Sequence, residues 1–114
     1  MTGALGASDR RASPRIAVAL DLHLERKVGN AVAARTLDLS VGGARVVSDR
    51  PLRVDEELRF DLRLGGGDEH LRGTARVLRQ HRHDTYALRF EHVAPAALRD
   101  LDAFVGSCAK APVV

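Results

Sequence analysis

The sequence predicts a mainly β protein, namely a six-stranded antiparallel β-barrel with a short C-terminal α-helix. Apolar and polar residues alternate with a period of two in several separate stretches, which is typical of half-buried strands. Short segments that contain glycine, proline or charged residues join these stretches, and no helical repeat lies between them. A helical repeat of apolar residues appears only after Pro95. Successive strands with short connections pair in antiparallel order.

The N-terminal half contains three predicted strands. The first covers residues 16–25, where apolar residues alternate with small or charged ones at Ile16, Val18, Leu20, Leu22 and Leu24. Gly29 and Asn30 are turn residues and end this hairpin arm. A second strand is predicted at residues 31–39 and a third at 44–48, so the tight turn between them joins two strands.

The C-terminal half contains three further strands and the helix. Residues 49–56 form a charged loop, and residues 58–64 then show the clearest β alternation in the chain. Residues 65–68 are predicted to be a hairpin connection to a fifth strand at 70–79, and residues 85–91 form the sixth. Pro95 opens a helix through Phe104, with Leu98, Leu101 and Val105 at helical spacing.

The barrel and the domain bounds follow from this order of elements. Closing the sheet removes its exposed edges, and the terminal helix can cover one open end. An open two-layer sandwich is the structural alternative. A length of 114 residues suits one domain with one core. We expect that domain at residues 10–106, with a flexible leader at 1–9 and a flexible tail at 107–114.

Composition limits the classes of protein to consider. The chain has 45% hydrophobic and 29% charged residues, as in an ordinary globular protein, and its formal net charge of +3 does not demand nucleic acid. The single cysteine, Cys108, cannot form an internal disulfide, which favours a reduced cytoplasmic setting. No run approaches the roughly 18 apolar residues of a membrane helix, so we expect no membrane span.

Two short motifs indicate the function. The first contains Arg10, Arg11 and Arg15, and Pro14 makes the chain there extended rather than helical. At about 3.3 Å per residue, Arg11 and Arg15 are separated by roughly 13 Å, enough to wrap a small anion. Arginine binds phosphate or a guanine edge with two parallel hydrogen bonds and stacks on purines.

The second motif is Asp38-Leu39-Ser40-Val41-Gly42-Gly43. The Asp38 carboxylate can accept two N–H groups of a guanine at once, and Ser40 can hold the turn or add a polar contact. Gly43, and also Gly42, allow a backbone conformation or a close approach that a Cβ would block. Together the two motifs predict a site for phosphate and guanine.

These residues resemble the PilZ family, whose pattern is Arg-x-x-x-Arg followed by Asp/Asn-x-Ser-x-x-Gly. The matching residues are Arg11, Arg15, Asp38, Ser40 and Gly43, and the resemblance covers about residues 9–106. It implies a small β-barrel that binds the bacterial second messenger cyclic di-GMP, with the arginine segment folded back over the barrel surface that carries the second motif. Ala87 stands where many family members have glycine, a mild departure.

The resemblance also implies how many ligands bind. In the family, an arginine just before Arg-x-x-x-Arg favours a stacked pair of ligands over a single one, and Arg10 holds that position. We therefore expect an intercalated cyclic di-GMP dimer. Arg79, near the end of the fifth predicted strand, is a further candidate for a stacking surface.

Several residues also have simpler interpretations. The arginine cluster could be a solvated basic tail, and Asp38 with Ser40 could form a self-bonded turn; the pairing of both motifs favours the ligand site. His81 and His83 lack a third well-spaced ligand, so no metal site is predicted. No serine or cysteine has an evident base partner, so we predict no enzyme and no cofactor.

Three functions remain to be compared. The first is a cyclic di-GMP receptor that relays the signal to an unidentified effector protein through ordering of residues 1–15. The alternative is a ligand-independent PilZ-like protein-interaction adaptor. A barrel for single-stranded nucleic acid is the third, but the chain has no Trp, one Tyr and three Phe, which is few for base stacking. We expect no nucleic acid polymer as partner, while a homodimer is left open.

Overall fold

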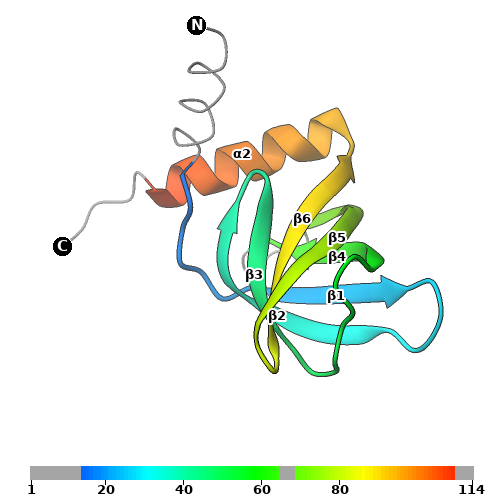
Figure 1. Cartoon of the computed structure of the whole chain (residues 1–114). Coiled ribbons are helices and arrows are strands. Elements are labelled where there is room, and N and C mark those ends of the chain that lie inside the picture. Colours follow the sequence, from blue (N-terminus) through cyan, green and yellow to red (C-terminus); the bar gives the residue numbers. More distant parts are fainter. Residues whose placement is uncertain (1–13, 65–68, 110–114) are drawn as a thin grey trace, which may run out of the picture.

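The structure is a closed six-stranded antiparallel barrel with one helix across an open end (Figure 1). It is a computed structural model and describes residues 14–64 and 69–109. The strands pair in the order β1–β2–β3–β6–β5–β4, and β1 pairs with β4 to close the ring. The predicted antiparallel barrel is thereby confirmed, and the alternative of an open sandwich is wrong.

The elements lie close to the predicted ranges. The six strands are β1 Asp21–Arg26, β2 Val32–Ser40, β3 Gly43–Ser48, β4 Glu57–Arg63, β5 His70–Arg82 and β6 Thr85–Val93. The C-terminal helix, α2, covers Pro95–Ala109. The ends of β2, β3, β4 and β6 differ from the prediction by two residues at most. The predicted hairpin connection at residues 65–68 lies outside the described residues.

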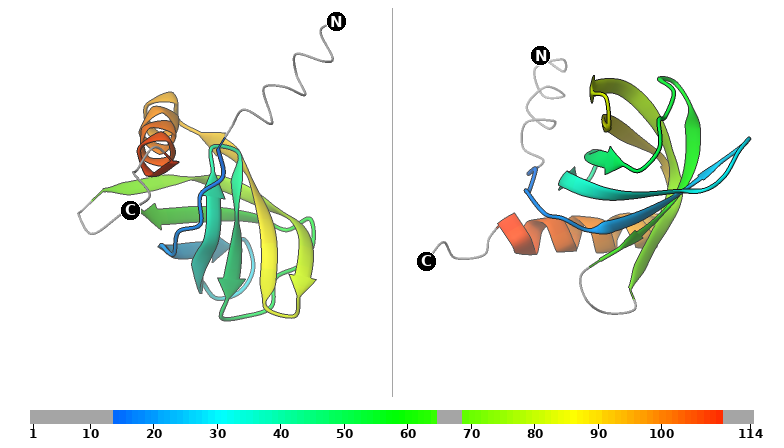
Figure 2. Two further views of the ribbon diagram at one scale, coloured as in Figure 1. Left: turned by 90° about the vertical axis from the view of Figure 1, so that its left-hand side faces the viewer. Right: turned by 90° about the horizontal axis from the view of Figure 1, so that it is seen from below.

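The first strand is shorter than predicted, because it begins at Asp21 and not at Ile16. Residues 16–20 run beside the second half of β2 instead, with one isolated bridge between Ile16 and Leu39 (Figure 2, left). The ladder of β2 with β3 shifts register between Thr36 and Asp38, which marks a β-bulge at Leu37. The alternation at residues 16–20 therefore reports side chains that face the core and not a continuous ladder.

Two elements are longer than predicted. β5 continues to Arg82, and its last five residues are all exposed, so no apolar pattern reveals them. The ladder between β5 and β6 is irregular between Val77 and Arg79 and again between Gln80 and Arg82. α2 continues to Ala109 instead of ending at Phe104.

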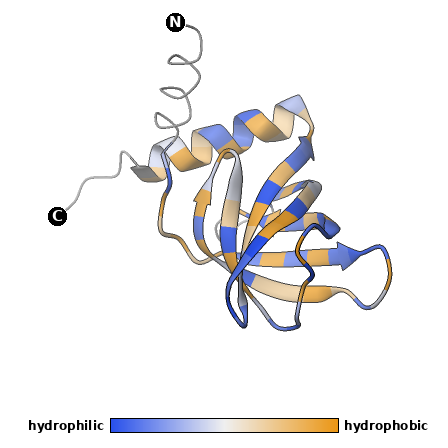
Figure 3. Cartoon of the chain, in the orientation of Figure 1, coloured by the Kyte–Doolittle hydropathy of each residue, from blue (hydrophilic) through white to orange (hydrophobic). Residues whose placement is uncertain are grey.

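The core fills the barrel and the space beneath α2. Alternating side chains of each strand point inward, which gives the banded hydropathy of the strands in Figure 3. Phe60 and Phe90 stack with ring centroids 4.7 Å apart, as expected for core aromatics. In α2, Leu101 and Val105 are fully buried and seal the barrel, whereas Leu98 is 39% exposed.

Candidate functional site

Asp38 lies at the centre of a network of arginines on the outer face of the barrel. It pairs with Arg45 across the β2–β3 hairpin, while the next pair, Leu39 with Ala44, points into the core. Although it is on the outer face, Asp38 is only 5% exposed. The side chains of Arg15 and Arg45 flank its carboxylate, and each is itself about half exposed.

The Asp38 carboxylate accepts three hydrogen bonds. Arg15 Nη1 donates to Oδ1 at 2.5 Å, Arg45 Nε donates to Oδ2 at 2.7 Å, and the Arg45 backbone N–H donates to Oδ1 at 3.2 Å. Burial alone would raise the pKa of Asp38, but the hydrogen bonds from Arg45 and Arg15 outweigh it and hold that pKa below its ordinary value. Asp38 is therefore an anion that holds two guanidinium groups in place.

The hairpin that follows Asp38 is tight. Val41 and Gly42 form its two-residue turn, and Ser40 pairs with Gly43. The Ser40 hydroxyl is 3.4 Å from the Gly43 carbonyl oxygen, a weak contact that spans the turn. The Gly42 carbonyl accepts a hydrogen bond of 2.9 Å from the backbone N–H of Phe90, which ties the turn to β6.

Gly43 is required by the packing of the barrel itself. A Cβ at this position would overlap the carbonyl oxygen of Leu88 and lie 3.2 Å from the Cα of Arg89. The close approach is made by the backbone of β6, which pairs with β3 here. Gly42 is different, because a Cβ there would meet nothing within 4 Å.

These residues line a hollow of about 620 Å³ formed by residues of β2, β3, β5 and β6 together with Arg15. The walls carry four arginines and one carboxylate, so the hollow is basic: Arg15, Arg45, Arg79 and Arg89 with Asp38. His81 and the exposed Leu78 complete one side. The structure thus brings Arg79, Gly42, Gly43, Ser40 and Asp38 together with Arg15, whereas Arg10 and Arg11 lie outside the described residues.

Ala87 forms the floor between two of these arginines. It pairs with Arg45 of β3 on one side and with Arg79 of β5 on the other. Since neighbouring strands are about 4.8 Å apart, the backbones of Arg45 and Arg79 stand roughly 10 Å apart with a small side chain between them. An anionic group that enters the hollow meets guanidinium groups on both sides.

Sequence reasoning did not single out Arg45 or Arg89. Arg45 could have been found, because a two-residue turn at 41–42 sets Asp38 opposite Arg45 by counting outward along the hairpin. Arg89 could not be found in this way. It pairs with Gly43, and the pairing of β3 with β6 joins strands that are distant in sequence.

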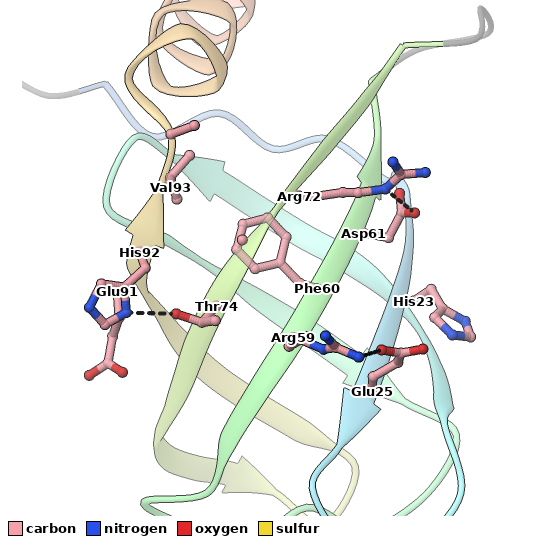
Figure 4. Close-up of a pocket in the computed structure, with 12 residues that line it drawn as sticks. His23, Glu25, Arg59, Phe60, Asp61, Arg72, Thr74, Glu91, His92 and Val93 are labelled. Atoms are coloured by element: carbon pink, nitrogen blue, oxygen red, sulfur yellow. Dashed lines mark hydrogen bonds and ion pairs between the residues drawn. The ribbon is translucent and has the colours of Figure 1, made fainter.

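A larger hollow, of about 820 Å³, lies on the outer face of β1, β4, β5 and β6 (Figure 4). Its ionic groups are balanced, with Glu25 bonded to Arg59 at 2.7 Å and Asp61 to Arg72 at 3.0 Å. Figure 4 shows Phe60 between these pairs and the Thr74–His92 hydrogen bond of 3.0 Å. Because its charges cancel in neighbouring pairs, this hollow is less suited to an anion than the one at Asp38.

One group of metal-ligand side chains lies among the described residues. Ligand atoms of Glu57, Glu91 and His92 are within 4.8 Å of one another. However, Lys27 holds Glu57 at 2.7 Å and Arg76 holds Glu91 at 2.9 Å. Cations of the protein already neutralise both carboxylates.

Comparison with known families identifies the class of domain that this barrel and its basic hollow define. The sequence model of the PilZ domain matches residues 9–107. The chain belongs to the PilZ family, and the resemblance seen in the two motifs is confirmed. A comparison with curated protein sequences finds no match.

Solved structures show the same fold. The inhibitor of motility MotI/DgrA of Bacillus subtilis superposes with a TM-score of 0.76 at 19% sequence identity. The match covers 90% of this chain and 54% of MotI, so this chain spans about half the length of MotI. The PilZ domain of Escherichia coli YcgR, determined with cyclic di-GMP, has a TM-score of 0.71 at 18% identity, over 89% of this chain and 92% of that domain. The PilZ domain of CeSA from a cellulose-synthesising bacterium follows with a TM-score of 0.59 and 21% identity, over 83% and 93%.

No helix within the described residues has both the length and the apolar character needed to cross a membrane.

Proposed function

We propose that this PilZ domain is a receptor for cyclic di-GMP and binds it in the basic hollow at Asp38. The observation that carries the proposal is the buried Asp38 carboxylate, which stands between the guanidinium groups of Arg15 and Arg45 on the family motif. Cyclic di-GMP presents two phosphates and two guanines. The hollow offers positive charge for the former, and an acceptor and planar guanidinium faces for the latter.

Each motif residue has a distinct role in this proposal. Arg15, and Arg11 and Arg10 before it, bind phosphate or the guanine O6/N7 edge. Asp38 accepts the guanine N1–H and N2–H groups, for which it must exchange one of its present hydrogen bonds with arginine. Ser40 and Gly43 act mainly through the hairpin, since their contacts in the structure are with the turn and with β6.

The expected ligand is an intercalated dimer. Such a dimer brings more phosphates than a single molecule, and Arg45, Arg79 and Arg89 add three guanidinium groups to those of the first motif. Arg45 and Arg79, on either side of Ala87, are well spaced to stack on or pair with a second ligand. A titration should then saturate near two ligands per chain.

The relay to a partner protein uses the N-terminal segment. Arg15 is bonded to Asp38, and in this proposal residues 1–15 become ordered as their arginines close on the ligand. This closure creates or hides a surface for an effector in the bacterial cytoplasm. The receptor acts without catalysis and without a cofactor.

Isothermal titration calorimetry with cyclic di-GMP tests the proposal. We expect saturable binding that GTP does not displace and that Arg15→Ala and Asp38→Ala each weaken at least tenfold. Arg35→Ala is the matched control, because Arg35 lies on β2 outside the hollow and is 65% exposed at its side chain. A folded protein that binds no cyclic di-GMP would contradict the proposal and favour the ligand-independent adaptor.

A further inference from the structure

The segment that carries Arg15 is attached to β2 at two places, and one of them is the buried side chain of Thr36. The Thr36 hydroxyl accepts a hydrogen bond of 2.8 Å from the Leu20 backbone N–H and donates one of 2.5 Å to the Val18 carbonyl. The Thr36 backbone N–H in turn donates to the Leu20 carbonyl at 3.0 Å. Thr36 is 1% exposed, and its hydroxyl has no other partner in the hydrogen-bond network.

These bonds replace part of a regular strand ladder. In an antiparallel ladder, two facing residues exchange both of their backbone N–H···O bonds. Here Leu20 and Thr36 make one such bond, and the hydroxyl of Thr36 takes the place of the carbonyl in the other. The substitution occurs where β2 bulges, between Thr36 and Asp38.

Beyond the bulge, the segment returns to backbone pairing directly beside the site. Ile16 and Leu39 exchange two N–H···O bonds, both of 2.9 Å. Ile16 is 8% exposed and Leu39 is fully buried. Arg15 precedes Ile16 and Asp38 precedes Leu39, so this bridge places Arg15 within reach of the Asp38 carboxylate.

We propose that Thr36 is a positioning residue for Arg15: its hydroxyl holds residues 16–20 against β2 and so keeps Arg15 at Asp38 before any ligand arrives. The inference rests on the proposed function for its effect on ligand affinity. Thr36 does not line the hollow and acts through the segment. A receptor in which Arg15 is held in advance loses less conformational entropy when it binds.

Thr36→Val and Thr36→Ser separate the hydroxyl from the shape of the side chain. Valine keeps the branched, buried shape and removes both hydrogen bonds, while serine keeps the hydroxyl and loses a methyl group. Hydrogen exchange measured by NMR without ligand reports on the segment, and the calorimetric Kd for cyclic di-GMP reports on the site. We expect valine to lower the protection of the Leu20 and Ile16 amides at least tenfold and to weaken binding about tenfold, and serine to restore both.

Several results would overturn the inference. Unchanged exchange at Leu20 and Ile16 in the valine variant shows that the hydroxyl does not hold the segment, and an unchanged Kd shows that holding it does not matter for the ligand. If the valine variant loses protection throughout β3 and β6, the substitution has disturbed the whole barrel. Thr36→Ala is then measured in its place, because alanine puts no methyl group against the Leu20 N–H and the Val18 carbonyl. A wild-type protein that does not bind cyclic di-GMP refutes the proposed function, while exchange still decides whether Thr36 holds the segment.

Discussion

In the proposed site, the single residue Asp38 serves both the fold and the ligand. Its carboxylate is buried on an outer face and stays ionised because two arginines donate to it. Removing it would leave Arg15 and Arg45 without their common acceptor and bring two positive charges together. Loss of this carboxylate should therefore change the position of the arginines as well as delete the guanine contact proposed above.

The pKa of Asp38 gives a prediction for acid stability. Burial opposes its ionisation, but hydrogen bonds from Arg45 and Arg15 lower the pKa below the unfolded value of about 3.9. The unfolded chain then binds the proton more readily, so this contribution to stability is complete above about pH 4 and is lost as the pH falls through the folded-state pKa. We expect Asp38→Asn to lose less free energy of unfolding between pH 5 and pH 3 than the wild type.

Urea unfolding at the two pH values measures this difference. The carboxyls of Glu56 and Asp61 also have lowered pKa values, because hydrogen bonds from Arg26 and from His70 and Arg72 outweigh their burial. Their protonation lowers the free energy of unfolding at acid pH by the same amount in the wild type and in Asp38→Asn. An equal decline in wild type and Asp38→Asn would mean that Asp38 is not held as an ion by its arginines.

At the scale of elements, the β2–β3 hairpin and β6 together shape the site. The tight turn sets Asp38 opposite Arg45, and β6 crosses so close to Gly43 that no side chain fits. We predict that Gly43→Ala lowers the free energy of unfolding by about 1–3 kcal/mol, as overpacking does, because β3 and β6 must move apart. Since that movement also displaces Arg45 and Arg89, ligand affinity should fall as well.

Gly42→Ala is the matched control for this prediction. A Cβ at Gly42 meets nothing within 4 Å, so the change should stay within about 0.5 kcal/mol, as for ordinary surface substitutions. Urea unfolding of both variants makes the comparison. Equal effects of the two substitutions would show that the contact with β6 does not explain Gly43.

The sequence allowed most elements to be predicted because alternation reports directly which side chains face the core. The same property explains the error at Ile16 and Leu20. Both face the core, yet the bulge at Leu37 prevents a regular ladder, and alternation carries no information about hydrogen bonds. The end of β5 was missed because Leu78 and the residues after it are all exposed. Since both faces of the strand meet solvent there, its sequence shows no alternation of apolar and polar residues.

The candidate site was predictable to the extent that it is local in sequence. Asp38, Ser40 and Gly43 belong to one hairpin and follow from its motif. Arg89 reaches the hollow only through the pairing of β3 with β6, which closes the barrel between distant segments. Thr36 gave no signal, because its role depends on where residues 16–20 lie after folding.

At the scale of the whole molecule, the net charge conceals how charge is distributed. A formal +3 is modest, and over much of the surface arginines are neutralised by carboxylates on neighbouring elements, as in Arg26–Glu56, Arg59–Glu25, Arg72–Asp61 and Arg76–Glu91. The hollow at Asp38 differs, because four arginines line it with one carboxylate, although Arg89 also contacts Glu91 at 3.4 Å. Folding therefore concentrates positive charge at one place that composition does not reveal.

The barrel gives this basic hollow a rigid support. The helix α2 closes one end through Leu101 and Val105, and the strands form a continuous ring of hydrogen bonds. The hollow thus presents arginines on β3, β5 and β6 and one segment, residues 14–20, that is tied to β2.

The most direct test is a titration of cyclic di-GMP into isotope-labelled protein, followed by amide chemical shifts in NMR spectra. We predict that the largest shifts occur at residues 38–45, at Arg79 and at Ala87, with little change around Thr74 and His92 in the larger hollow. Saturable binding with this distribution supports a cyclic di-GMP receptor that uses the hollow at Asp38. Shifts centred on the larger hollow, or no shifts at saturating ligand, would contradict it.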